Sequence, residues 1–191
     1  MAVYEFVGAA TVSDSTTNLV SFTSISTSDD WKTFQLFGSL SLQDTSAATT
    51  QSLYIQLNST SGNYYIGGFV SSGSALSSGV WRMGGYSQTF FDAQSSIQAN
   101  QHWTDTGGDW VNGRGTTSWT FPMAGAATRK VAGGLTMSGA PRNTSAGGFD
   151  SSTGASDNTD ALTTVNVKCG YTQYFGDGSH FELYAIKDTN A

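Results

Sequence analysis

The amino-acid sequence predicts an all-β fold, an antiparallel two-sheet sandwich of jelly-roll-like type, in a single domain that spans residues 1–191. The first observation is the composition. Charged residues make up 12% of the chain, about half of the ~25% that is typical of soluble domains. Ser, Thr, Gly and Asn take their place. This composition is poor in strong helix formers, whereas Thr, Val, Ile and the aromatic residues favour strands and the small polar residues favour turns.

The second observation is a repeated alternation of apolar and polar residues with a period of two, which indicates half-buried strands. In WKTFQLFGSLSLQ, the apolar residues that share one face are Phe34, Leu36, Leu40 and Leu42. In SLYIQLN, the corresponding residues are Leu53, Ile55 and Leu57. Gly38 falls in the first of these rows, and its missing side chain predicts a bulge, a bend or the close approach of another segment.

Turn-rich connections separate these strands and predict how they are joined. Residues 31–70 are interpreted as an antiparallel meander of three strands, because short polar linkers connect them. Pro122 should end its strand or hold it at an edge, since proline donates no ladder hydrogen bond. Further strands are expected at 19–25, 80–86, 118–123, 130–138, 162–169 and 181–186, the last held within a sheet although it lies near the C-terminus.

Two other segments show no strand pattern. Residues 139–160, rich in Gly, Ser, Thr, Asn and Asp, are interpreted as a long loop with almost nothing to bury. Such a loop is expected to be mobile or to be ordered by a neighbouring subunit. The stretch DAQSSIQANQ around residue 95 is the one passable helix.

The motifs of common enzymes are missing from the sequence. There is no Gly-x-Ser-x-Gly nucleophile elbow and no phosphate-binding glycine motif. The two histidines, His102 and His180, and the two glutamates, Glu5 and Glu182, form no recognisable catalytic pattern. The sequence predicts a protein that is not an enzyme and has no cofactor.

Metal and thiol chemistry are not favoured either. No His or Cys cluster has the spacing of a metal site, and the loop aspartates that could bind calcium follow no EF-hand pattern, so they are interpreted as solvated turn residues. We therefore expect no bound metal. The single cysteine, Cys169, is interpreted as an inert, half-buried strand residue.

Charge and targeting signals restrict the partners. The formal net charge of −6 and the scattered Lys and Arg disfavour a nucleic acid, which requires clustered positive charge. No segment approaches the ~20 apolar residues of a membrane span, and the N-terminal stretch lacks the features of a signal peptide. We expect synthesis in a cytoplasm and no membrane partner.

Residues 102–119 concentrate aromatic surface in a segment that otherwise resembles a loop. Trp103, Trp110 and Trp119, with Arg114 between the last two, combine flat apolar faces with a planar polar group. Such sets bind sugars or other proteins, so these four residues are the candidate interaction site. The alternative is that the tryptophans plug one end of the core, and Trp119 is the strongest candidate for that role.

Two stretches of the chain carry a family resemblance. The segment NLVSFTSISTSDDWKTFQLFGSLSLQDTSAATTQSLYIQLNSTSGNYY and the terminal HFELYAIK together resemble small virion structural proteins of tailed, often marine, bacteriophages. The resemblance covers roughly residues 19–66 and 180–187. Its shared positions are core and turn residues, so it carries no functional residue to this chain.

The resemblance implies a capsid decoration protein, head fibre or tail appendage that is located in the virion and forms a symmetric homo-oligomer. We expect the chain to bind copies of itself, with a trimer favoured, and other virion proteins, with a host-surface glycan as a further candidate partner. One alternative is a free carbohydrate-binding, lectin-like module. A weaker alternative is a hydrolase of cell-surface glycans. Symmetry separates the first two, because a virion protein should form a closed oligomer whereas a lectin module can work alone.

Overall fold

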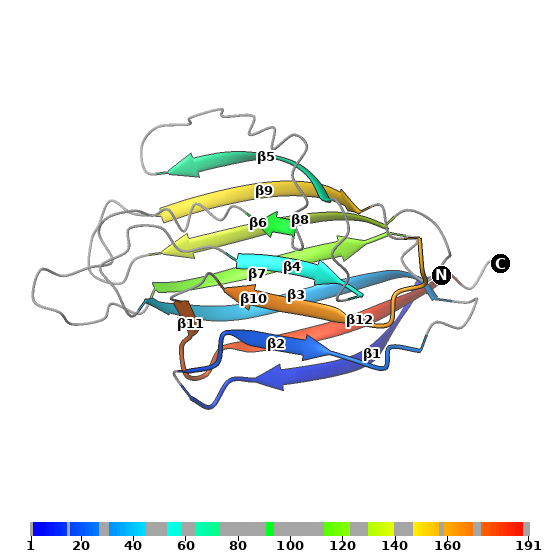
Figure 1. The fold of residues 1–191 in the computed structure, drawn as a ribbon, viewed down its shortest axis with the longest axis horizontal. Coiled ribbons are helices and arrows are strands. Elements are labelled where there is room, and N and C mark those ends of the chain that lie inside the picture. Colours follow the sequence, from blue (N-terminus) through cyan, green and yellow to red (C-terminus); the bar gives the residue numbers. More distant parts are fainter. Residues whose placement is uncertain are drawn as a thin grey trace, which may run out of the picture.

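The computed structural model describes residues 2–14, 16–26, 31–44, 53–58, 64–72, 91–93, 113–122, 130–139, 147–156, 159–169 and 173–188. These residues form two antiparallel sheets, a larger one and a smaller one, in an all-β, sandwich-like arrangement (Figure 1). The all-β prediction and the prediction of two antiparallel sheets are therefore confirmed for this part of the chain.

The larger sheet contains eight of the described strands. Its order is β1 (Ala2–Thr11), β12 (His180–Asp188), β3 (Trp31–Asp44), β7 (Gly113–Phe121), β8 (Lys130–Gly139), β9 (Gly147–Ser156) and β5 (Tyr64–Ser72). The short β11 (Gln173–Phe175) pairs with the end of β3, beyond the part of β3 that pairs with β12. The terminal strand β12 lies between β1 and β3, which confirms that the chain end is held within the sheet.

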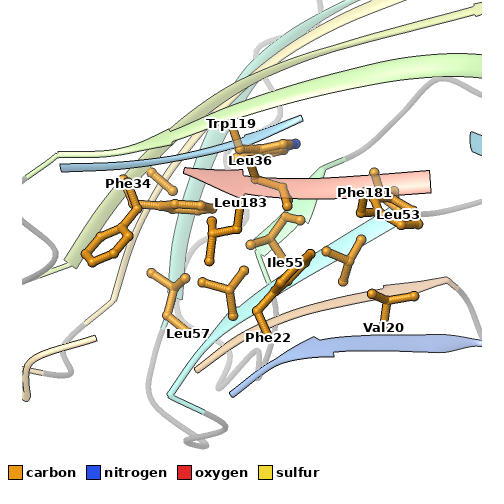
Figure 2. Close-up of a cluster of buried hydrophobic side chains, with 14 of the residues drawn as sticks. Val20, Phe22, Phe34, Leu36, Leu53, Ile55, Leu57, Trp119, Phe181 and Leu183 are labelled. Carbon is orange, nitrogen blue, oxygen red and sulfur yellow. The ribbon is translucent and has the colours of Figure 1, made fainter. Parts of the chain in front are cut away.

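The smaller sheet has four described strands, and the core lies between the two sheets. Its order is β2 (Leu19–Phe22), β10 (Val165–Cys169), β4 (Leu53–Leu57) and β6 (Phe91–Ala93). Apolar side chains from both sheets meet in one buried cluster (Figure 2). Its largest fully buried members are Trp119, Phe34, Phe121, Phe175, Phe181, Leu36, Leu53 and Ile55.

The alternating rows predicted from the sequence face this core. Phe34, Leu36 and Leu40 of β3 are buried, as are the three predicted residues of β4. Gly38 lies in the buried row because Phe181 and Thr117 approach it closely, and neither pairing of β3 shows a register shift there. Among the three predicted alternatives for Gly38, close approach is the observed one. Strand β7 ends at Phe121, one residue before Pro122, as predicted.

The predicted three-strand meander over residues 31–70 was wrong. Strand β3 belongs to the larger sheet, β4 to the smaller sheet, and β5 returns to the larger sheet, where it pairs with β9. The two connections therefore change sheets. An alternating pattern shows which face of a strand is buried, but it does not show which of the two sheets the strand joins.

The predicted loop over residues 139–160 was also wrong for residues 147–156. Gly147–Ser156 forms β9, which pairs with β8 on one side and β5 on the other. Backbone hydrogen bonds on both edges hold this strand, although its small side chains give no alternating apolar signal. Strands β1, β6 and β11 were not predicted either. The predicted strand at 80–86 lies outside the described residues, as does the predicted helix from residue 94 onward.

Candidate binding site

The four predicted interaction residues are only partly within the described part of the chain. Trp103 and Trp110 lie outside it, and Arg114 is described as a backbone position of β7 without its side chain. Trp119 is 1% exposed, and its indole Nε1 donates a hydrogen bond to Oγ1 of Thr117 over 2.9 Å. Trp119 thus occupies the core, the alternative role considered for it, while the roles of the other three residues remain predictions.

A polar network that the sequence did not predict lies on the outer face of the larger sheet. Along β12, Phe181, Leu183 and Ala185 are buried, so the alternate residues, His180, Glu182 and Tyr184, point away from the core. The Tyr184 hydroxyl donates to Oε2 of Glu182 over 2.8 Å, and His180 Nε2 lies 3.2 Å from Oε1 of the same carboxylate. The His180 Nδ1 atom shares a 2.7 Å hydrogen bond with Oγ1 of Thr11 on the neighbouring strand β1.

These hydrogen bonds fix the charge of Glu182. The bond from the Tyr184 hydroxyl, followed by the bond from His180, lowers the pKa of the Glu182 carboxyl below its ordinary value of 4.5. The same interaction raises the pKa of the Tyr184 hydroxyl. Around neutral pH this face therefore carries an ionised carboxylate whose two oxygens are held in place by neighbouring donors.

Exposed aromatic rings flank the network. The Phe6 ring of β1 meets the Tyr184 ring edge-on, with centroids 5.7 Å apart and an interplanar angle of 69°. The Phe37 ring of β3 meets it from the other side at 6.0 Å and 72°. Edge-to-face pairs of this kind are favourable, so Tyr184 joins the carboxylate to a row of three rings across β1, β12 and β3.

An open groove of about 410 Å³ lies beside this network. Two cross-strand rows form it. One row runs from Glu182 through Phe37 and Ser118 to Leu135, and the other from His180 through Ser39 to Thr116. The central residues Ser39, Thr116 and Ser118 have small side chains, whereas Phe37, Leu135, His180 and Glu182 at the ends of the rows have larger ones. This difference in size forms the groove.

A second unusual surface lies at one edge of the molecule. Strands β1 and β2 are the end strands of their two sheets, and they contact each other along the same edge (Figure 1). Five of the six large apolar side chains that are exposed in the described residues belong to these two strands, with exposures between 37% and 57%. They are Val3, Tyr4, Phe6, Val7 and Leu19.

The hydrogen-bonded series Thr11, His180 and Glu182 resembles a hydrolase triad in its residue types but differs in its geometry. In a triad the nucleophile bonds to Nε2 of the histidine and the acid to Nδ1, whereas here Thr11 is at Nδ1 and Glu182 at Nε2. The Glu182 carboxylate is also 38% exposed and accepts a bond from Tyr184. The arrangement suits recognition of a ligand better than activation of a nucleophile.

Other reactive groups in the described residues are few. Burial raises the pKa of the Cys169 thiol to about 12, and its Sγ atom donates to the carbonyl oxygen of Asn18 over 3.5 Å. Such a thiol is a poor nucleophile because the thiolate is the reactive form. Among the described residues, no group of three or more His, Cys, Asp or Glu side chains could hold a metal ion. That part of the chain also contains no helix long and apolar enough to cross a membrane.

The sequence pattern could have indicated only part of the outer-face site. FELYAI shows that Glu182 and Tyr184 share the face opposite Phe181 and Leu183, but Phe37 and Ser118 join them only through strand pairing between distant segments. Comparison with known proteins adds no relative from which a site could be transferred. No protein-family model matches the chain, and no match was found among the curated proteins or the solved structures.

Proposed function

We propose that this chain is a structural protein of a bacteriophage virion, built on a jelly roll, that assembles with copies of itself and with other virion subunits and contacts the host surface. The observation that carries the proposal is the strand order of the two sheets. The adjacent strands β1, β12, β3 and β7 in the larger sheet, and β2, β10, β4 and β6 in the smaller one, match the order expected of an eight-stranded jelly roll.

The path of the chain supports this interpretation. The strands alternate between the sheets from β1 to β4, and again through β6, β7, β10 and β12. Strands β8, β9 and β5 then extend the larger sheet beyond β7, and β11 continues along β3. Jelly rolls form viral capsid domains and lectin domains, so the fold favours these two classes, and the bacteriophage resemblance favours the first.

Fold alone does not define function, and the edge formed by β1 and β2 supplies the second support. Exposed apolar side chains gathered at one edge of a soluble protein favour an interaction site there. Strand β1 is ten residues long, contains no Lys or Pro, and among the described residues pairs only with β12. Its exposed residues include one charged side chain, Glu5, and its pairing with β12 shifts register between Phe6 and Gly8, but an end strand of this length still offers one edge for pairing with another chain. We assign the subunit contact to this edge.

Light scattering coupled to size-exclusion chromatography tests the assembly. The wild-type chain should elute as a closed oligomer of its 20.1 kDa subunit, a trimer by the resemblance. Val7→Lys places a charge in the proposed contact and should shift the mass toward the monomer. Phe37→Lys makes a similar change on β3, two strands from the edge, and should leave the mass unchanged. Equal masses for the wild type and Val7→Lys would contradict the assigned edge.

Mass spectrometry of bacteriophage particles, purified from a culture in which the chain is expressed, tests whether the chain is part of the virion. Peptides of the chain should occur in the particles in a fixed ratio to the capsid or tail proteins. A monomeric chain found only in the soluble fraction would contradict the proposed function.

A further inference from the structure

The groove on the outer face of the larger sheet has the dimensions of a small-ligand site. Its volume of about 410 Å³ falls within the roughly 300–1,000 Å³ of known ligand pockets. Its residues come from β12, β3, β7 and β8, four adjacent strands whose pairing fixes their positions. Sites built on strands hold their side chains more precisely than sites built on loops.

One wall of the groove combines an aromatic ring with a fixed carboxylate. Phe37 is 38% exposed, and Tyr184 packs edge-on against it. Tyr184 also donates to Glu182, which pairs directly with Phe37 across the strands. A ring face offers apolar contact to C–H groups, while a carboxylate accepts several hydrogen bonds at once. Together these groups suit a ligand that has an apolar face and hydroxyl groups at its rim.

The floor and the opposite wall supply further polar groups of the matching kind. Ser39 and Thr116 line the groove as exposed residues and Ser118 as a partly exposed one, and each hydroxyl group can both donate and accept hydrogen bonds, although most of the lining surface is apolar. The His180 ring, 41% exposed, borders the same space. An uncharged ligand with hydroxyl groups can therefore form hydrogen bonds with these side chains.

The charge of the groove narrows the ligand class. Among the described residues that line the groove, Glu182 is the one carboxylate, and none is Lys or Arg. The chain as a whole has a net charge of −6. Anionic ligands such as phosphates and sialylated or sulfated glycans would be repelled, because like charges disfavour each other across a shared site.

We infer that this groove binds a neutral saccharide, with a sugar ring against Phe37 and sugar hydroxyl groups bonded to Glu182 and to the Ser39 and Thr116 side chains. The inference rests on the proposed contact with the host surface and gives that contact a ligand class and a location. The groove includes Thr116 and Ser118 from the end of the predicted tryptophan segment, and Tyr184 links its Phe37 ring to Phe6 of the edge assigned to subunit contact.

Binding of the full chain to a printed panel of neutral and anionic oligosaccharides, followed by calorimetry with the strongest neutral binder, tests the inference. We expect binding to neutral sugars, and a loss of about tenfold or more in affinity for Glu182→Gln, since hydrogen bonds to a charged group are stronger than those to a neutral one. Phe37→Ala should weaken binding comparably. Tyr54→Ala, which removes a half-buried aromatic ring from β4 of the smaller sheet, outside both the groove and the assigned edge, is the matched control and should bind like the wild type.

Thermal melting of each variant establishes that it is folded, and light scattering on the same samples separates this inference from the proposed assembly. An oligomer that binds no neutral sugar would overturn the groove inference and leave the assembly intact. A monomer whose sugar binding depends on Glu182 and Phe37 would support the groove and contradict the assembly. Preference for anionic glycans, sugar binding that survives both groove substitutions, or a change of oligomeric mass in Phe37→Ala would each overturn the inference.

Discussion

Replacement of Gly38 by alanine tests how tightly the larger sheet packs on its core. A Cβ atom at this position would lie 2.7 Å from Cδ1 and 2.9 Å from Cε1 of Phe181, and 2.9 Å from Cγ2 of Thr117. Both neighbours are buried, and the Phe181 ring packs against Phe175 with a centroid distance of 5.1 Å. The added methyl group therefore cannot be accommodated by moving one side chain into open space.

The expected change in stability follows from two opposing effects. Overpacking of a tight core costs roughly 1–3 kcal/mol. Changing Gly to Ala also restricts the unfolded chain, which stabilises the folded state by about 0.4–1 kcal/mol where the backbone conformation suits alanine. Gly38 meets this condition, because it does not have the positive φ that Gly178 has. We expect Gly38→Ala to lower the free energy of unfolding by about 1–2 kcal/mol, or the melting temperature by roughly 2–8 °C.

Gly8→Ala is the matched control, since Gly8 also lies in a strand and also lacks a positive φ. Its added Cβ would meet Cδ1 of Phe22 at 3.6 Å, an ordinary contact. Gly8→Ala should be neutral or slightly stabilising. Urea unfolding followed by circular dichroism measures both variants, and equal stability of the two would refute the packing argument for Gly38.

Four further predictions address the core, the thiol, the carboxylate and one strand. Leu36→Asp should abolish soluble expression, because Leu36 is fully buried and an unpaired charge there has no compensation; folded protein with unchanged melting would disprove this. Burial raises the pKa of the Cys169 thiol to about 12, so it should react with a disulfide reagent about a thousandfold more slowly than an ordinary thiol until the chain unfolds. Carbon NMR should show the Glu182 carboxyl titrating below pH 4.5, and Tyr184→Phe should raise its pKa. The contribution of this carboxylate to folding stability is therefore complete above pH 4.5 and is lost as the pH falls through the lowered pKa. Amide exchange should show protection in β9, and rapid exchange throughout it would argue against the observed pairing.

The sequence predicted strands well where one face is apolar and the other polar. Strands β3 and β4 have this pattern, and both were located with their buried rows correct. Strand β1 was missed because Tyr4 and Phe6 add aromatic residues to its exposed positions, which removes the alternation. Strand β9 was missed for the opposite reason: its residues, GGFDSSTGAS, contain one large apolar side chain. In both strands, pairing with neighbours determines the structure more than side-chain pattern does.

The candidate site was harder to predict because its residues come together through the topology. Glu182, Phe37 and Ser118 lie in one cross-strand row but come from three distant parts of the chain. A pattern along one strand fixes which residues share a face and leaves the partner strand open. The tryptophan content near residue 110 indicated other residues, and the one described tryptophan of that set, Trp119, belongs to the core.

The composition of the chain connects the two proposed surfaces and also explains why they differ. With 12% charged residues, the protein has few ion pairs available for recognition and must rely on apolar contact and on hydroxyl groups. The edge residues Val3, Val7 and Leu19 offer apolar area in which Glu5 is the one charged side chain of β1, and this mainly apolar composition suits burial against another protein chain. The groove places Phe37 beside Glu182 and several hydroxyl groups, and burying these polar groups against a second protein would cost free energy unless each found a partner. A sugar supplies such partners from its own hydroxyl groups, so the same low-charge composition that favours assembly at the edge favours a hydroxylated ligand in the groove.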